Sequence, residues 1–360
     1  MKRFRRVFVL LLFLAPFFAE GVETDIRQFG IVSARSVVDP EKGLLIYKKP
    51  LSELIDLDYP AFIDFVSGES LMGPPLEKAH LDEHLYALLK QIPRETDPMQ
   101  VLLSLLPLVN VEGSLREQRD TLVAKAPLLL GAIVNHCRGG CVKKEVVGED
   151  FIELILDSLN LELDAYAPFD LFFKTHTIHG KGNVSCFASL VTSSSHPKLN
   201  ESLVAMAAAL HGELHGGANR KVIEQLSEWQ SDEPSEIWLT NWIADKLSSG
   251  KKLYGYGHGI LQVPDPRAEL LKEMARARFP ENRFVKRALY LSQFAPSILA
   301  DLKPRMRSKY YNVDAFSGPL LSEYIEPRFL TLLFFFSRMM GNMAEIIDNR
   351  VFYRPMDLSY

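Results

Sequence analysis

The sequence predicts a mostly α-helical fold with a small N-terminal β-hairpin, and three observations support this prediction. Strong helix formers fill residues 200–210. Asp-Pro pairs open two further helical stretches, at 97–103 and 265–271. Only residues 43–50 have the composition of a short extended segment. A chain of 360 residues can bury a large core, so we expect one or two closely associated domains.

Each expected helix has an identifiable start. Asp97 and Asp265 are the expected N-caps of two helices, because a proline follows each of them at the first helical position. Asn200 is the expected cap of the alanine-rich helix. Residues 328–347 are apolar nearly all round, which predicts a buried central helix. The chain contains no internal repeat and no low-complexity linker.

Composition narrows the function classes. The chain carries 45 acidic and 41 basic residues, for a net charge of −4, and therefore lacks the basic excess typical of a nucleic-acid binder. Its three cysteines form an odd set without the second pair that a zinc site would need. They indicate free thiols and a reducing compartment.

The N-terminal segment 1–21 indicates a different compartment from the one that the cysteines indicate. Four cations at positions 2, 3, 5 and 6 precede an apolar run from 7 to 18, which is the layout of a secretory signal. An organelle presequence or an unusual terminus are the alternatives. The run is too short for a membrane-spanning helix, so no stable membrane span is expected. We expect a cytoplasmic or organelle-matrix protein, with export as the alternative.

Three motifs follow one another in the second half of the chain: Leu-His-Gly-Gly-Ala-Asn at 214–219, Gly-Tyr-Gly-His at 255–258 leading to Asp-Pro-Arg at 265–267, and Asn-Val-Asp-Ala at 312–315. They supply two histidines, one carboxylate and one arginine. Such a set suits proton removal next to a carbonyl, with neutral donors for the developing oxyanion and cations for a second substrate.

The histidines and the aspartate of these motifs, and Arg338 in the expected central helix, each also have a purely structural interpretation. Arg338 interrupts an apolar stretch, so it either pairs with a buried acid or binds an anionic ligand. His215 is either a packing residue or an oxyanion donor beside its two glycines. His258 can be incidental to a turn. Asp314 is expected in a loop before residues 317–319, where an isolated aspartate usually forms a cap or turn.

Two histidine pairs have spacings that a metal ion can use, His176 with His179 and His211 with His215. The second pair reads His-Gly-Glu-Leu-His, in which the glutamate is displaced by one place from the zincin motif, and the glycine pair ends the helix at the second histidine. We therefore expect no metal site.

In this order the motifs resemble those of the citrate synthase family. The three motifs above are joined by Ser-Arg-x-x-Gly at 337–341, by His-x-x-His at 176–179 followed by Gly-Asn-Val-Ser, and by Tyr-Arg-Pro at 353–355. Weaker similarity reaches back to residues 97–99 and 41–43. The resemblance covers the chain from about residue 28 to its end, leaving only the leader-like segment outside it.

The resemblance implies a two-domain helical homodimer, with a large domain formed by residues 22–215 and 321–360 and a small domain formed by 216–320. It implies condensation of acetyl-CoA with oxaloacetate, followed by hydrolysis of the thioester, without a cofactor or metal. Asp314 would be the base, His215 would stabilise the enol, and His258 would polarise the oxaloacetate carbonyl. Oxaloacetate would be bound by His179, Arg267, Arg338 and Arg354, with Arg354 reaching the partner subunit's site.

The chain departs from the family pattern near the expected CoA site. Gly259, Gln262 and Val263 stand where cations often hold the CoA phosphates. Two alternatives therefore stay open. One is a 2-methylcitrate synthase that uses propionyl-CoA, which differs by one methylene and only about 1–3 kcal/mol of binding energy. The other is a non-catalytic paralogue that retains the fold.

Overall fold

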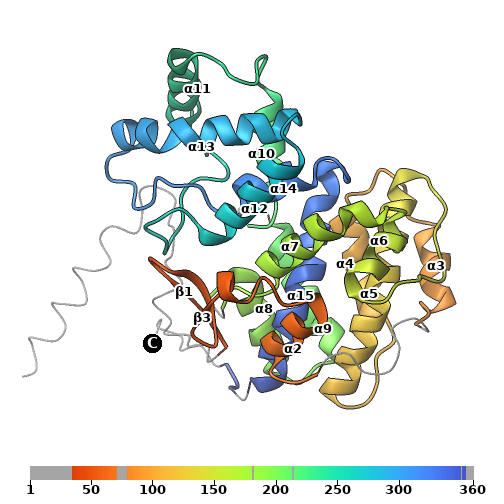
Figure 1. Ribbon diagram of the computed structural model, residues 1–360. Coiled ribbons are helices and arrows are strands. Elements are labelled where there is room, and N and C mark those ends of the chain that lie inside the picture. Colours follow the sequence, from red (N-terminus) through yellow and green to blue (C-terminus); the bar gives the residue numbers. More distant parts are fainter. Residues whose placement is uncertain (1–34, 71–78, 181, 213–214, 350, 354–360) are drawn as a thin grey trace, which may run out of the picture. The chain divides into compact units, whose positions relative to one another are not determined.

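The computed structural model describes residues 35–70, 79–180, 182–212, 215–349 and 351–353 (Figure 1). Its described part is mostly helical, as predicted. The helices are α2 (Tyr59–Ser67), α3 (Glu83–Leu89), α4 (Pro98–Leu105), α5 (Leu115–Arg138), α6 (Phe151–Leu159), α7 (Tyr166–His176), α8 (Val184–Ser193), α9 (Leu199–His211), α10 (Ala218–Ser227), α11 (Glu236–Ser248), α12 (Pro266–Arg278), α13 (Arg283–Leu302), α14 (Asp314–Leu321) and α15 (Leu330–Asp348).

The N-terminal sheet has three short antiparallel strands in the order β1 (Ser36–Asp39), β2 (Gly43–Ile46) and β3 (Lys49–Pro50). The predicted extended segment forms β2 and β3, whereas β1 is an additional strand. In the β1–β2 turn the Asp39 carboxylate accepts hydrogen bonds from the backbone N–H groups of Glu41 and Lys42, at 2.9 and 2.8 Å. This local capping fixes the turn that leads into β2.

Both Asp-Pro helix starts are confirmed. The Asp97 carboxylate accepts from the Met99 N–H at 2.9 Å, and α12 has the same arrangement at Asp265. The expected cap at Asn200 is wrong, because α9 begins at Leu199 with Lys198 as its N-cap. The Asn200 amide instead donates to three carbonyl oxygens of the α4–α5 connection. A tertiary contact therefore uses the side chain that the sequence assigned to capping.

Helix α15 is the predicted central helix, and its residues from Leu330 to Ile347 are all buried. It packs against α5, α7, α8 and α9, which surround it in Figure 1. Among the described residues, Pro327–Asp348 is the one helical stretch long and apolar enough to cross a membrane, and its most apolar 18 residues are all enclosed within the protein. That enclosure is typical of a core helix.

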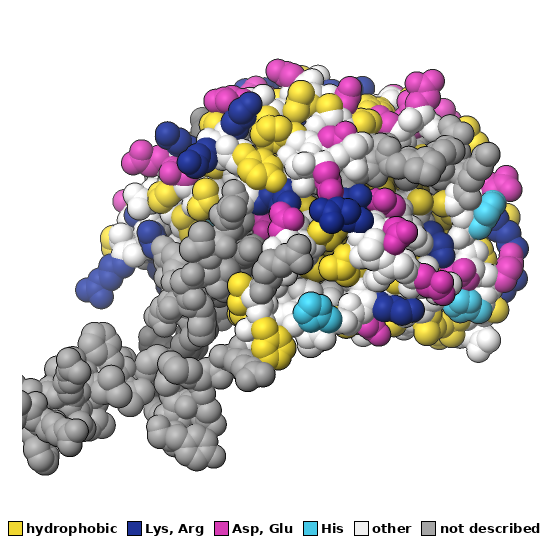
Figure 2. Space-filling model, turned by 90° about the horizontal axis from the view of Figure 1, so that it is seen from below, with side chains coloured by type: hydrophobic (Ala, Val, Ile, Leu, Met, Phe, Trp, Pro, Cys, Tyr) yellow, Lys and Arg dark blue, Asp and Glu magenta, His cyan; other side chains and the backbone are white. Residues whose placement is uncertain are grey.

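Helices α10 to α14 lie together in the upper part of Figure 1, and α2 to α9 lie with α15 below them. The expected domain limits at 216 and 320 stay a prediction. On the face shown in Figure 2, basic and acidic side chains are interspersed and no large area has a single sign. That pattern agrees with the near-balanced composition of the chain.

Candidate active site

His258 lies in the loop between α11 and α12, and backbone contacts fix its ring. Its Nδ1 atom accepts hydrogen bonds from the N–H groups of Ile260 and Leu261, both at 3.0 Å. Because backbone N–H groups only donate, the ring proton must be on Nε2. Burial, assisted by the nearby Arg267 cation, lowers the pKa of His258 to about 4. His258 is therefore a neutral Nε2–H donor at physiological pH.

Arg267 occupies the first turn of α12 and forms a buried ion pair with Asp265, with an Nη2–Oδ2 distance of 2.7 Å. Asp265 also accepts from the Val313 N–H at 3.1 Å, next to Asp314. Although burial alone would raise the pKa of Asp265, the Arg267 charge holds it below the ordinary value. The buried Nη1 of Arg267 has no hydrogen-bond partner among the described residues, which leaves one donor open for a ligand.

Arg338 projects from the centre of α15 and is only 1% exposed. Its Nε donates to the His176 carbonyl oxygen at 2.7 Å, and its guanidinium lies 4.7 Å from the Phe334 ring centroid. Within the described part of the chain no carboxylate lies within ion-pair distance of Arg338, so the structural ion pair is not found there. Burial lowers the pKa of this arginine. An unpaired buried guanidinium is a strong site for an anion.

His215 lies in the connection between α9 and α10, where the chain folds back on itself. The Gly216 N–H donates to the Leu210 carbonyl at 2.8 Å, and a Cβ on Gly216 would lie 2.3 Å from that oxygen, so only glycine fits. Thr331 of α15 holds the same segment by donating to the Gly216 carbonyl. Burial, and to a lesser degree Arg338, lowers the pKa of His215 to about 4, which keeps it neutral.

His179 completes the group of histidines, and its ring centroid is 5.9 Å from that of His258. Burial lowers the pKa of His179 well below its ordinary value, and the charges of Arg267 and Arg338 act in the same direction. His215 contributes to the same effect. The structure thus brings together residues that lie more than a hundred and fifty positions apart in the chain, from 179 to 338.

Asp314 is the first residue of α14, which corrects the expectation that it lies in a loop. Ser317, Gly318 and Pro319 lie inside the helix instead of forming a turn. Gly318 serves a close approach, since a Cβ there would lie 2.8 Å from the Asn219 carbonyl of α10. Burial raises the pKa of Asp314 to about 6, against the opposing influence of the two site arginines.

The histidines and the aspartate of the candidate site are more exposed than its two arginines. The side chains of His179, His215, His258 and Asp314 each keep part of their surface accessible, whereas those of Arg267 and Arg338 are almost fully covered. The neutral histidines and the weakly acidic carboxyl are thus partly accessible, whereas the two cations are covered. Such an arrangement can bind a dianion and move a proton.

Two other expectations have different outcomes. Arg354 lies outside the described residues. His176 is fully buried, and its Nδ1 lies 2.8 Å from the Phe172 carbonyl, so it acts as a packing residue behind the site. In the described part of the chain, no group of three or more His, Cys, Asp or Glu side chains is placed to hold a metal ion.

Ser185, at the start of α8, is a site residue that the sequence analysis did not identify. Its Oγ lies 3.0 Å from Nε2 of His215 and 2.8 Å from Oδ1 of Asn183, the N-cap of α8. The serine is completely buried. No sequence spacing links it to His215, because the two meet only when α8 packs against α9.

A basic loop between α13 and α14 was also missed. Its four cations are Lys303, Arg305, Arg307 and Lys309. None of them forms an ion pair with an acid in the described part of the chain. The loop is held beside His258, because the Gly257 N–H donates to the Tyr310 carbonyl at 3.0 Å. The alternation of cations just before the Asn-Val-Asp motif was the available signal.

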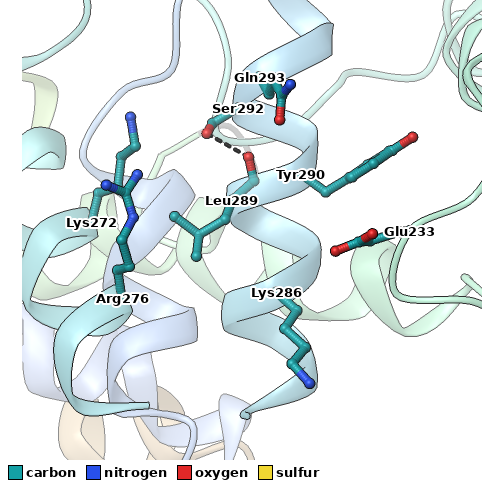
Figure 3. Close-up of a pocket in the computed structure, with 8 residues that line it drawn as sticks. All are labelled: Glu233, Lys272, Arg276, Lys286, Leu289, Tyr290, Ser292 and Gln293. Atoms are coloured by element: carbon teal, nitrogen blue, oxygen red, sulfur yellow. Dashed lines mark hydrogen bonds between the residues drawn. The ribbon is translucent and has the colours of Figure 1, made fainter. Parts of the chain in front are cut away.

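A separate concavity of about 440 Å³ lies between α12, α13 and the loop before α11, and Figure 3 shows it. It contains none of the predicted site residues. Each of its three cations pairs with an acid: Lys272 with Glu269, Arg276 with Glu273 and Lys286 with Glu281. It therefore offers less uncompensated charge than the site around Arg338.

Comparisons with known proteins agree with the observed fold. The model of the family "Citrate synthase, C-terminal domain" matches residues 74–356. The peroxisomal citrate synthase of Saccharomyces cerevisiae is 26% identical over 365 residues, covering 89% of this chain and 79% of that protein.

Two solved structures share the fold. The citrate synthase of Thermoplasma acidophilum, solved as a ternary complex with carboxymethyl coenzyme A and oxaloacetate, superposes with a TM-score of 0.78 at 20% identity, covering 91% of this chain and 93% of that one. That of Thermotoga maritima has a TM-score of 0.76 at 23% identity, covering 94% and 93%. With the family model matching most of its length, the chain belongs to the citrate synthase family, a family of acyltransferases.

Proposed function

We propose that the protein condenses acetyl-CoA with oxaloacetate and hydrolyses the resulting thioester to citrate and CoA. One observation carries the proposal: neutral histidines and a carboxyl of raised pKa lie within electrostatic reach of two buried arginines. The structural neighbour from Thermoplasma acidophilum, solved with oxaloacetate and a CoA analogue, adds support.

Oxaloacetate is a dianion with a ketone between its carboxylates. Arg338 supplies one uncompensated cation, and Arg267 supplies an open Nη1 donor although Asp265 offsets its charge. The Nε2–H of His258 then polarises the ketone oxygen. A neutral imidazole suits this role, since it donates a hydrogen bond without adding a third positive charge beside the arginines.

Asp314 takes a proton from the acetyl methyl group, and the C–H electron pair forms the carbon–carbon double bond of the enol. His215 donates a hydrogen bond to the enol oxygen, for which its proton must be on Nδ1. In the structure the Ser185 hydroxyl donates its one proton to Asn183 Oδ1, and its Oγ lies 3.0 Å from His215 Nε2. Rotation of this hydroxyl toward His215 Nε2 would select the required tautomer. The enol carbon attacks the ketone carbon, and the alkoxide formed there takes the Nε2 proton of His258, which regains a proton from solvent. Water then displaces the CoA thiolate.

The basic loop gives CoA a place to bind. Arg305 and Arg307 are exposed and lie beside the His258 loop, where they can meet the phosphates of an acyl-CoA. They compensate for the uncharged residues at 259, 262 and 263. The proposal therefore does not require the cations that the sequence analysis found missing.

Release of free CoA thiol, followed with a thiol-reactive dye, tests the proposed activity. Acetyl-CoA and propionyl-CoA are each supplied with oxaloacetate, and omission of oxaloacetate is the control. The proposal expects oxaloacetate-dependent release with a higher kcat/KM for acetyl-CoA. A higher kcat/KM for propionyl-CoA would establish the 2-methylcitrate reaction instead. No release with either donor would establish a non-catalytic paralogue.

We also propose a homodimer in which Arg354 completes the partner subunit's site, a proposal supported by the family resemblance. Mixing an Arg354→Ala variant with an Asp314→Asn variant tests it. Subunit exchange should restore activity, because each mixed dimer contains one site with both native residues. Mixed dimers without recovered activity would contradict a contribution in trans.

A further inference from the structure

The N-terminal sheet contacts two segments that carry candidate substrate-binding residues. On one side, the Ser36 carbonyl of β1 lies against Gly180, the residue after His179, where an added Cβ would be 3.3 Å from that oxygen. On the other side, the Pro40 carbonyl accepts a hydrogen bond of 2.9 Å from the Gln262 N–H. Gln262 lies in the loop between His258 and α12.

The tightest contact is between Gly43 and Pro266. Gly43 has a φ of +77°, and a Cβ built on it would lie 2.7 Å from both Cγ and Cδ of the proline ring. Pro266 is the first residue of α12, and the next residue is Arg267. The backbone at the end of the β1–β2 turn, where β2 begins, therefore lies directly against the start of the helix that contains this arginine.

We propose that the β1–β2 turn is a positioning element for oxaloacetate, which sets the placement of Arg267 and His258 relative to His179. The inference rests on the proposed function and adds a role for a sheet that contains no candidate catalytic residue. The turn touches no reacting group, so its effect is exerted through the placement of oxaloacetate-binding side chains. The basic loop at 303–309, which we propose to bind acyl-CoA, belongs to a different segment of the chain.

A pair of glycine variants tests the proposal. Gly43→Ala places a methyl group against the Pro266 ring, whereas Gly250→Ala has a similar φ of +73° and no atom within 4 Å. The two variants share the backbone penalty and differ in the contact with α12. Misplacement by about 1 Å can cost up to about a hundredfold, so we expect Gly43→Ala to raise the KM for oxaloacetate about tenfold. By the same reasoning, we expect the KM for acetyl-CoA to change by less than about twofold, and Gly250→Ala to leave both within about twofold.

Two further variants keep the test decisive if Gly43→Ala folds poorly. Pro266→Ala removes the ring atoms that the new methyl group would meet, so the Gly43→Ala/Pro266→Ala protein should fold and match the oxaloacetate KM of Pro266→Ala. A folded double variant whose KM is raised well above that of Pro266→Ala would overturn the proposal.

The remaining outcomes separate the two proposals. If the wild-type protein is active and Gly43→Ala shows the same kinetics as Gly250→Ala, the positioning role is overturned and the proposed function stands. An equal rise in both KM values would also overturn it, since general destabilisation has that effect. Wild-type protein without thiol release would overturn the proposed function and this inference with it.

Discussion

Replacing Asp314 by asparagine should stabilise the protein while abolishing its activity. Burial raises the pKa of Asp314 from 3.8 to about 6. Each pKa unit corresponds to about 1.4 kcal/mol, so keeping this carboxylate ionised at pH 7.5 costs the folded state up to about 3 kcal/mol. Between pH 3.8 and about 6 the folded state holds a proton that the unfolded state has lost, so this site lowers stability as the pH rises. Asparagine has a similar shape and does not ionise.

Urea unfolding of both proteins between pH 4 and 8 measures this difference. The advantage of Asp314→Asn should grow as the pH rises toward about 6 and then stay constant at up to about 3 kcal/mol. Asp56→Asn, at an exposed carboxylate, is the control and should change stability by less than about 0.5 kcal/mol. An Asp314→Asn protein that is less stable than wild type at pH 7.5 would refute the reasoning, because it would mean that the ionised carboxylate stabilises the fold.

Three further substitutions test individual contacts. Ser185→Ala should lower kcat about tenfold with little change in either KM, because a lost hydrogen bond of about 1 kcal/mol would leave the His215 tautomer unselected; an unchanged kcat would contradict that role. Arg305→Ala with Arg307→Ala should raise the KM for acetyl-CoA and weaken its salt dependence, while the KM for oxaloacetate stays constant; equal changes in both would show that the loop does not bind CoA. Arg338→Lys should raise the KM for oxaloacetate at least about tenfold, because an ammonium cannot replace the planar fork; wild-type kinetics in this variant would exclude Arg338 as a carboxylate ligand.

The predictions that rested on neighbouring residues in the sequence were correct for the two Asp-Pro helix starts. Asp97 and Asp265 cap helices as predicted, because the aspartate, the following proline and the N–H groups they serve lie within three residues of one another. Tertiary contacts account for the errors. Asn200 looked like a cap, but its amide is used by carbonyl groups about 90 positions away. Gly318 looked like part of a turn, but its missing side chain allows α14 to approach α10.

The candidate site shows the same division. The glycine-flanked histidines and Asp314 lie in compact motifs, so their residue types already indicated acid–base chemistry. The tautomer of His258 was not predictable, because it depends on how the backbone at 260 and 261 turns toward the ring. Ser185 and the β1–β2 turn were missed for a similar reason. Ser185 contacts a residue 30 positions away, and the turn contacts residues more than 200 positions away. A single sequence does not show which residues of such distant segments will lie opposite one another.

The pH dependence of thiol release tests the central claim most directly, because the claim assigns one ionisable group to each role. The kcat/KM for acetyl-CoA should fall tenfold per pH unit below about pH 6, as Asp314 becomes protonated. His215 and His258 should stay neutral through this range, since burial lowers the pKa of each to about 4. At pH 7.5, Asp314→Asn should retain no more than about a hundredth of the wild-type rate. Full activity in Asp314→Asn, or a rate that rises as the histidines gain protons, would contradict the account.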